Sequence, residues 1–195
     1  MPSPPAPPDV IAAAQSAGAR ILGIDPGSLV TGWGLVGGTP NRPRWLDAGI
    51  VRLGRSSDAA PLRLWRLWRE LSTLIERLRP DSAAVESPYH GSNARSALQL
   101  AQARGVALAA LAGAGVEVVE YTPATVKKTV TGNGRAAKEQ VRAMVARLLG
   151  RASLPGTDDL SDALAVALCH ASIRRHRACV DRALHGETDR TRPPG

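Results

Sequence analysis

The stretch ILGIDPGSLVTGWGLV, residues 21–36, decides how the rest of the chain is interpreted. It begins as an apolar run typical of a buried strand, but the run ends on a carboxylate, Asp25, which Pro26 and Gly27 follow at once. An unpaired charge at a buried position costs free energy, so such an acid is usually paired or bound to a metal ion. The stretch therefore predicts two strands joined by a turn, with a functional acid at the end of the first strand.

Working outward from this stretch, apolar periodicity predicts a mixed α/β domain. Strand patterns occupy residues 20–25, 30–36, 44–53, 82–87 and 116–121. Helical patterns occupy residues 60–79, 93–115, 122–132, 136–150 and 157–177. Thr122 is expected to cap the third of these helices, and Gly150 to end the fourth. An antiparallel meander of three strands, followed by alternating helices and strands, predicts a mixed five-stranded sheet flanked by helices.

The length of 195 residues suits one domain with a full core. Residues 1–18 are expected to be a flexible arm rich in Pro and Ala, residues 19–177 the folded domain, and residues 178–195 a flexible charged tail. The N-terminus does not resemble a signal peptide, and no long uncharged apolar run exists. Cys169 and Cys179 lack metal or redox spacing. These features predict a reduced, cytoplasmic protein.

The chain carries a formal net charge of +8, which is typical of proteins with an anionic partner such as nucleic acid. A GC-rich coding bias toward Arg explains the same charge equally well. The lysines, however, occur in one short segment, at Lys127, Lys128 and Lys138. In a chain whose other basic residues are all Arg, this clustering indicates positions where an ammonium group is preferred.

Four acids are expected to converge. Asp25 and Glu86 each end a predicted strand, and functional groups of α/β sheets gather at the carboxyl ends of strands. Asp159 and Asp162 are three residues apart on the last predicted helix, so they share one face of it. If that helix packs beside the first strand, the four carboxylates meet at one place.

A cluster of carboxylates without His or Cys suits a hard cation, Mg²⁺ or Mn²⁺. Two such ions bridged by one acid suit phosphodiester hydrolysis. Asp25, at the centre of the sheet, is the expected bridging ligand, and Gly27 is expected to leave room for a phosphate backbone. Each acid alone also has a simpler explanation, such as capping a turn, pairing with an Arg or facing solvent. The joint pattern of two strand-end acids favours the metal site, and Asp158 is left as the helix cap.

Five segments together closely resemble the RuvC family of bacterial Holliday junction resolvases. They are ILGIDPGSLVTGWGLV, AVESPY, SALQLAQARGVALAA, VKKTVTGNGRAAKEQV and DDLSDALAVALCHA. The similarity covers most of residues 20–175. It implies an RNase H-like fold, a homodimer, and Mg²⁺-dependent nicking of two opposed strands at a four-way junction, alongside a RuvA–RuvB branch-migration complex.

The resemblance also assigns residues. The family's metal-binding acids fall on Asp25, Glu86, Asp159 and Asp162. Its DNA-contacting basic positions fall on Lys127 and Lys138, and Lys128, adjacent to Lys127, is expected to contact DNA with them. An aromatic residue that meets unpaired bases in the family is commonly Phe, whereas here it is Tyr89, which can still stack. The neighbouring Ser87, Pro88 and His90 also depart from the family pattern.

The small-residue face of the helix at 94–113 would let two subunits approach closely, and a two-fold dimer matches the pseudo-two-fold symmetry of a junction. A plain core helix is the alternative. Three other function classes are alternatives: an actin-like ATP-binding module, a junction-binding protein without catalysis, and a nuclease for RNA–DNA hybrids on the same fold. The chain is too short for the second lobe that an actin-like module needs, which disfavours the first. The resemblance alone favours the junction.

Overall fold

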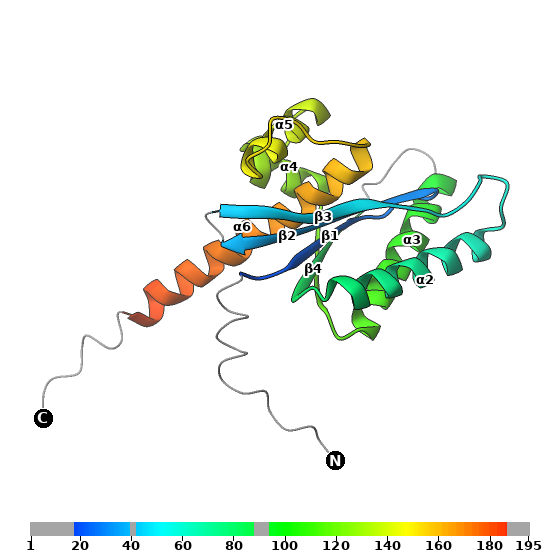
Figure 1. Cartoon of the computed structure of the whole chain (residues 1–195), viewed down its shortest axis with the longest axis horizontal. Helices are drawn as coiled ribbons and strands as arrows, with labels where there is room; N and C mark the ends of the chain where they lie inside the picture. The colour runs from blue at the N-terminus through cyan, green and yellow to red at the C-terminus, as the bar shows by residue number, and fades with distance from the viewer. Residues whose placement is uncertain (1–17, 40–41, 88–93, 187–195) are drawn as a thin grey trace, which may run out of the picture.

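The computed structural model describes residues 18–39, 42–87 and 94–186. Those residues form a five-stranded sheet with helices on both faces (Figure 1). The strands are β1 (Ile21–Asp25), β2 (Val30–Thr39), β3 (Arg42–Arg52), β4 (Ser82–Glu86) and β5 (Glu117–Tyr121). The helices are α2 (Ala60–Leu78), α3 (Ala94–Gly113), α4 (Pro123–Thr131), α5 (Lys138–Leu148) and α6 (Asp158–Gly186).

The strand order in the sheet is β3-β2-β1-β4-β5. β1 and β3 both pair antiparallel with β2, whereas β4 is parallel to β1 and β5 is parallel to β4. The predicted meander followed by parallel strands is confirmed. Because β1, β4 and β5 run in the same direction, their carboxyl ends lie at one edge of the sheet.

Two hydrophobic cores lie on opposite faces of the sheet. Leu22 and Ile24 of β1 pack with α2 and α3 on one face, and Ile21 packs with α4, α5 and α6 on the other. This follows from the alternation of side chains along a strand. On α2, Leu67 and Leu71 lie one turn apart and are fully buried, as its apolar periodicity predicts.

α6 approaches the sheet closely because glycines lie beneath it. A Cβ atom at Gly32 would overlap the carbonyl oxygen of Asp159, and one at Gly23 would overlap the backbone of Ala163. A Cβ at Gly34, which pairs with Gly23 across the strands, would press on Leu164. These three glycines set the helix directly on β1 and β2.

A buried polar pair fixes α6 against β5. The hydroxyl oxygen of Tyr121 lies 2.8 Å from Nδ1 of His170, and both side chains are buried. Burial, reinforced by Arg174, lowers the pKa of His170 to about 4, so the ring is neutral at physiological pH. The pair joins the end of β5 to the middle of α6.

α6 continues past residue 177, where the sequence predicted the end of the last helix, and runs to Gly186. From Arg174 to Leu184 all of its residues are exposed, so no apolar periodicity marks this part in the sequence. The division into an arm, a domain and a tail stays a prediction, since residues 1–17 and 187–195 lie outside the described part.

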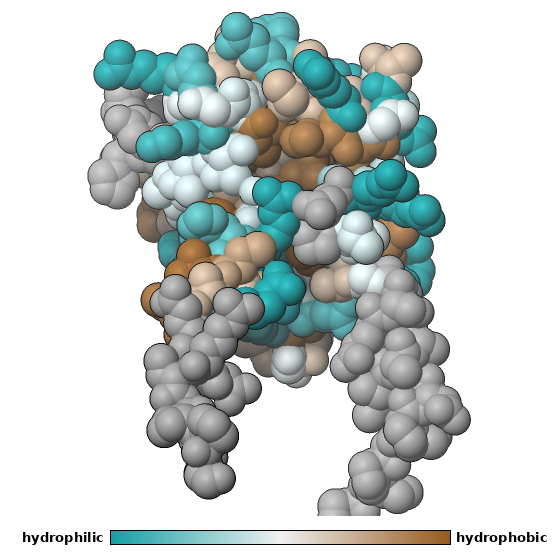
Figure 2. All heavy atoms as spheres, turned by 90° about the vertical axis from the view of Figure 1, so that its left-hand side faces the viewer, coloured by the Kyte–Doolittle hydropathy of each residue, from teal (hydrophilic) through white to brown (hydrophobic). Residues whose placement is uncertain are grey.

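Figure 2 shows the end of the molecule at the left of Figure 1, where hydrophobic surface in the upper half is surrounded by hydrophilic side chains. A groove of about 430 Å³ between α4, α5 and α6 is lined by Val130, Met144 and Leu168, with Arg147 and Arg175 beside them.

Across the three described ranges, no helix is both long enough and apolar enough to cross a membrane.

Candidate active site

Asp25 is the last residue of β1, where it pairs with Gly32 of β2. The turn that follows is closed by its own backbone. The amide of Gly27 donates to Oγ1 of Thr31 at 3.4 Å, and a Cβ at Gly27 would overlap the carbonyl oxygen of Val30. The sequence predicted that the missing side chain of Gly27 leaves room for a phosphate backbone. That prediction is wrong, because the Val30 carbonyl fills the space that a Gly27 side chain would occupy.

Glu86 ends β4, the parallel neighbour of β1. The last registered pair of the two strands is Ile24 with Val85, so Asp25 and Glu86 follow side by side at the same edge. This is the placement that the strand-end argument predicted. The two acids come from segments about sixty residues apart in the sequence.

The first turn of α6 brings Asp159 and Asp162 to the same edge. The backbone of Asp159 lies over Gly32, the partner of Asp25, because Gly32 has no side chain. The Asp162 side chain is 24% exposed and faces the cleft between the sheet and α5. The glycine-mediated contact between α6 and the sheet thus adds two acids from the helix to two from the strands.

The acids interact electrostatically. Burial raises the pKa of Asp25 to about 6, with further increases from the charges of Asp162 and Asp159. Burial raises the pKa of Glu86 to about 8, again with contributions from Asp25 and Asp162. For Asp162 itself burial raises the pKa, and the hydrogen bond from Lys138 partly offsets this. Several carboxylates therefore compete for a limited amount of positive charge.

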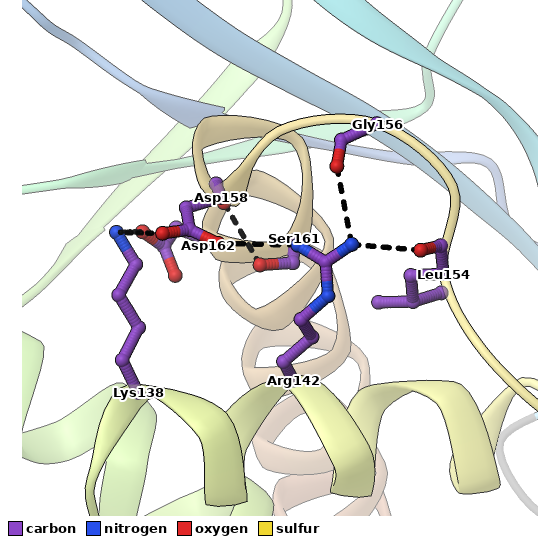
Figure 3. A network of polar contacts seen from close by, with 7 residues as sticks. All are labelled: Lys138, Arg142, Leu154, Gly156, Asp158, Ser161 and Asp162. Carbon is purple, nitrogen blue, oxygen red and sulfur yellow. Dashed lines mark hydrogen bonds and ion pairs between the residues drawn. The ribbon is translucent and has the colours of Figure 1, made fainter.

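Lys138, the first residue of α5, supplies part of that charge (Figure 3). Its Nζ lies 3.0 Å from Oδ2 of Asp162 and 3.4 Å from Oδ2 of Asp158. One turn later on α5, Arg142 donates to Oδ1 of Asp158 at 3.1 Å and to the Leu154 carbonyl at 2.7 Å. The two basic residues attach α5 to the start of α6.

The sequence interpretation of Asp158 as a simple helix cap missed this function. Asp158 is the first residue of α6, and its carboxylate pairs with both Lys138 and Arg142. The available signal was the spacing of Lys138 and Arg142, four residues apart on a predicted helix, which places them on one face. Their acidic partner cannot be identified from spacing alone.

A cleft of about 240 Å³ opens beside the acids. The residues that line it come from β4 and the three helices of this face: Glu86, Pro123, Val126, Lys127, Lys138, Val141, Asp162 and Ala165. Lys127 and Lys138 thus share one cleft with two of the acids. Lys128 is exposed on α4 and does not line it, and Tyr89 lies outside the described residues.

The donor set fits a hard divalent cation, since all four candidate ligands are carboxylates. As the side chains stand, however, no three His, Cys, Asp or Glu residues of the described chain are grouped closely enough to hold a metal ion. Asp162 is instead paired with Lys138. The four acids share one edge of the sheet, but they are not drawn together as in a loaded centre.

Comparison with known proteins identifies the family of this chain. The family model for crossover junction endodeoxyribonuclease RuvC matches residues 21–170. A RuvC from Chloroflexus aurantiacus is 49% identical over 152 residues, which cover 78% of this chain and 92% of that relative. T. thermophilus RuvC in complex with a Holliday junction substrate has a TM-score of 0.76 at 34% identity, covering 81% of this chain and 96% of that one.

The yeast mitochondrial Holliday junction resolvase Ydc2 has a TM-score of 0.61 at 13% identity, covering 80% of this chain and 79% of that one, which supports the fold alone. The mixed sheet with flanking helices is RNase H-like, as the sequence resemblance implied. The family match spans β1, β4 and the start of α6, the elements that carry the four acids. The chain therefore belongs to the RuvC family of crossover junction endodeoxyribonucleases.

Proposed function

We propose that the protein is a metal-dependent endonuclease that resolves four-way DNA junctions by paired nicks in opposed strands, during recombination and repair. The observation that carries the proposal is the convergence of acids from β1, β4 and α6 at one edge of an RNase H-like sheet, in a member of a nuclease family. The T. thermophilus relative was solved with a Holliday junction substrate, which supports the same substrate here.

We assign Asp25, Glu86, Asp159 and Asp162 to the binding of two Mg²⁺ ions, with Mn²⁺ as an alternative. Bound metal would supply an aimed hydroxide and stabilise the leaving oxygen of the phosphodiester. Asp25 has Glu86 beside it on β4 and α6 above it, so it is the acid best placed to be a shared ligand.

We assign DNA binding to the lysines around the cleft. Lys127 and Lys138 line it beside Glu86 and Asp162, which suits contact with the phosphates that flank the cut. Lys128 is exposed one residue further along α4 and would contact the backbone outside the cleft. Tyr89 follows Glu86 by three residues, and we propose that it stacks on unpaired bases at the crossover.

We also propose that the working unit is a homodimer. The outer face of α3 carries an exposed stripe at helical spacing, formed by Leu98, Ala101, Gly105, Ala109 and Ala112. Small residues let two helices approach closely, and two equivalent sites suit two equivalent strands. The family resemblance supports cytoplasmic action beside a RuvA–RuvB branch-migration complex.

The test is nicking of a synthetic four-way junction in Mg²⁺, beside linear duplex and an RNA–DNA hybrid. We expect nicks in the junction alone, and in Asp25→Asn a rate at least about 10³-fold lower with junction binding retained, because the acids hold metal while lysines hold phosphate. Cleavage of the hybrid instead would overturn the substrate. Binding without any cleavage would favour a junction-binding protein.

A further inference from the structure

The ammonium group of Lys138 pairs directly with an acid of the candidate site. Its Nζ is 3.0 Å from Asp162, an acid that we assign to metal binding. We infer that Lys138 is the resident counter-ion of the metal-free site, and that a divalent cation must displace it from Asp162. The inference rests on the proposed function for the identity of the metal ligands.

The geometry makes Lys138 suited to this exchange. It is the first residue of α5, and its flexible four-carbon side chain, 49% exposed, reaches across to α6. The electrostatic effect of Lys138 extends beyond its ion pair, because its charge also stabilises the ionised forms of Asp25 and Glu86. A single ammonium therefore does part of what metal would do for several carboxylates.

The structure also provides a place for the displaced ammonium. Asp158 lies 3.4 Å from the same Nζ and is 57% exposed, at the solvent side of the pair with Asp162. Arg142 holds the other oxygen of Asp158 while it donates to the Leu154 and Gly156 carbonyls (Figure 3). Asp158 can thus retain Lys138 beside the cleft when Asp162 turns to a metal ion.

This arrangement couples metal binding to DNA binding. In the metal-free protein the Lys138–Asp162 pair must be broken before Asp162 can ligate metal, and also before the ammonium can bind a phosphate. When the metal ion and the DNA both bind, the free energy needed to break the Lys138–Asp162 pair is spent only once. Each ligand therefore raises the affinity for the other by the same factor. Lys138 is then a positioning residue that makes the site assemble when metal and DNA are both present.

The experiment is calorimetric titration of the full chain with Mg²⁺ in the absence of DNA. In Lys138→Met we expect Mg²⁺ affinity to rise about fivefold or more, as removal of a partly exposed ion pair allows. Lys127→Met is the control for charge alone, because Lys127 acts on Glu86 from the same cleft, and should give a smaller rise. Lys128→Met, exposed and outside the cleft, should leave the affinity unchanged.

Equal affinities in Lys138→Met and Lys127→Met, or weaker binding in Lys138→Met, would overturn the inference. Thermal melting separates it from a purely structural role for Lys138. If Lys138 acts as a counter-ion, Lys138→Met should melt at a lower temperature than the wild type in chelator, and Mg²⁺ should remove the difference. If Lys138 only ties α5 to α6, the melting temperature of Lys138→Met should stay below that of the wild type in Mg²⁺ as well.

A second measurement uses the fact that the lysines are few. Amine labelling followed by mass spectrometry reports Lys127, Lys128 and Lys138 separately. We expect Mg²⁺ to increase the labelling of Lys138 relative to Lys128, and an unchanged ratio would contradict displacement. None of these readouts requires cleavage, so a wild-type protein that fails to nick junctions would overturn the proposed function without affecting this test.

Discussion

Asp25 and Glu86 show what a buried strand-end acid costs a small domain in folding free energy. Both end buried strands, and for both the folded state favours the protonated form, mainly because burial penalises charge. Between the usual carboxyl pKa and these raised values, the folded protein binds more protons than the unfolded chain. These two carboxyls therefore contribute a decrease in stability, in the absence of metal, as the pH rises from about 4 to about 8. His170, whose lowered pKa has the opposite effect, offsets part of this decrease below about pH 6.5, so the contribution of Glu86 is clearest above that pH.

Replacement of Glu86 by Gln removes the larger of these two effects. We expect Glu86→Gln to flatten the decline and to raise the free energy of unfolding at pH 9 by about 1–3 kcal/mol, a value reduced from the full pKa shift because the carboxyl is partly solvated. The measurement is urea denaturation in chelator at pH 5, 7 and 9.

Glu76→Gln is the matched control for that prediction, since Glu76 is an exposed acid on α2, away from the candidate site. It retains Glu86 and should therefore retain the decline above about pH 6.5. Added Mg²⁺ should stabilise the wild type more at pH 8 than at pH 5, because metal competes with protons for the same carboxylates. A parallel profile for Glu86→Gln and the wild type would show that Glu86 is not held among the other acids.

At the scale of elements, the site depends on how closely α6 lies on β1 and β2. Gly32 permits that approach, since any side chain there would meet the backbone of Asp159. Backbone cannot yield as a flexible side chain can. We expect Gly32→Ala to lower the free energy of unfolding by about 1–3 kcal/mol or more and to weaken Mg²⁺ binding, because it moves Asp159 and Asp162 away from Asp25.

Gly113→Ala tests whether glycine loss alone explains such an effect. Gly113 ends α3, and a Cβ there would meet nothing within 4 Å. This substitution should be neutral or stabilise by about 0.4–1 kcal/mol, because it restricts the unfolded chain. Chemical denaturation and Mg²⁺ titration of both variants provide the comparison, and wild-type metal binding by Gly32→Ala would contradict the close-approach argument.

The sequence predicted most elements because their signals are local. The apolar spacing of α2 and the Thr122 cap of α4, whose hydroxyl accepts from the Thr125 amide at 3.2 Å, depend on residues a few positions apart. The strand-end placement of Asp25 and Glu86 also followed from general sheet geometry. Features that depend on residues close together in the sequence can therefore be predicted from the sequence.

The detailed contacts of α6 with β2 and α5 escaped prediction. Nothing near Gly32 indicates that α6 will lie over it, and nothing near Asp158 indicates that it will pair with Lys138 and Arg142. The Gly27 interpretation was wrong for a related reason, since the space beside a glycine can be filled by backbone that only the folded turn brings there. The assignment of the four acids to metal stays a prediction that their convergence supports.

At the scale of the whole molecule, nicking two opposed strands of a four-way junction calls for two sites, and the described residues of one chain bring the candidate acids together at one place. The described surface contains a face suited to a second copy: Leu98 on α3 is 61% exposed, and Gly105, two turns later, has open space where its side chain would be. Neighbouring α2 adds Trp65 and Trp68, which are about half exposed. Large apolar side chains exposed on two helices that contact each other favour an interface at these helices.

Gly105→Arg would place a long charged side chain on the small-residue stripe of α3. Because the same residues of both copies meet in a two-fold interface, the substitution introduces the charge twice. It should convert the proposed dimer to monomer at micromolar concentration, as measured by sedimentation or light scattering. Ala114→Arg, an exposed position two and a half turns after Gly105 and so on the opposite side of the helix axis, should behave as the wild type. We further expect Gly105→Arg to nick junctions one strand at a time, so that nicked intermediates accumulate at least about tenfold over paired products, since each monomer retains its own acids. A Gly105→Arg protein that stays dimeric, or that still makes paired cuts as a monomer, would place the subunit contact on another surface.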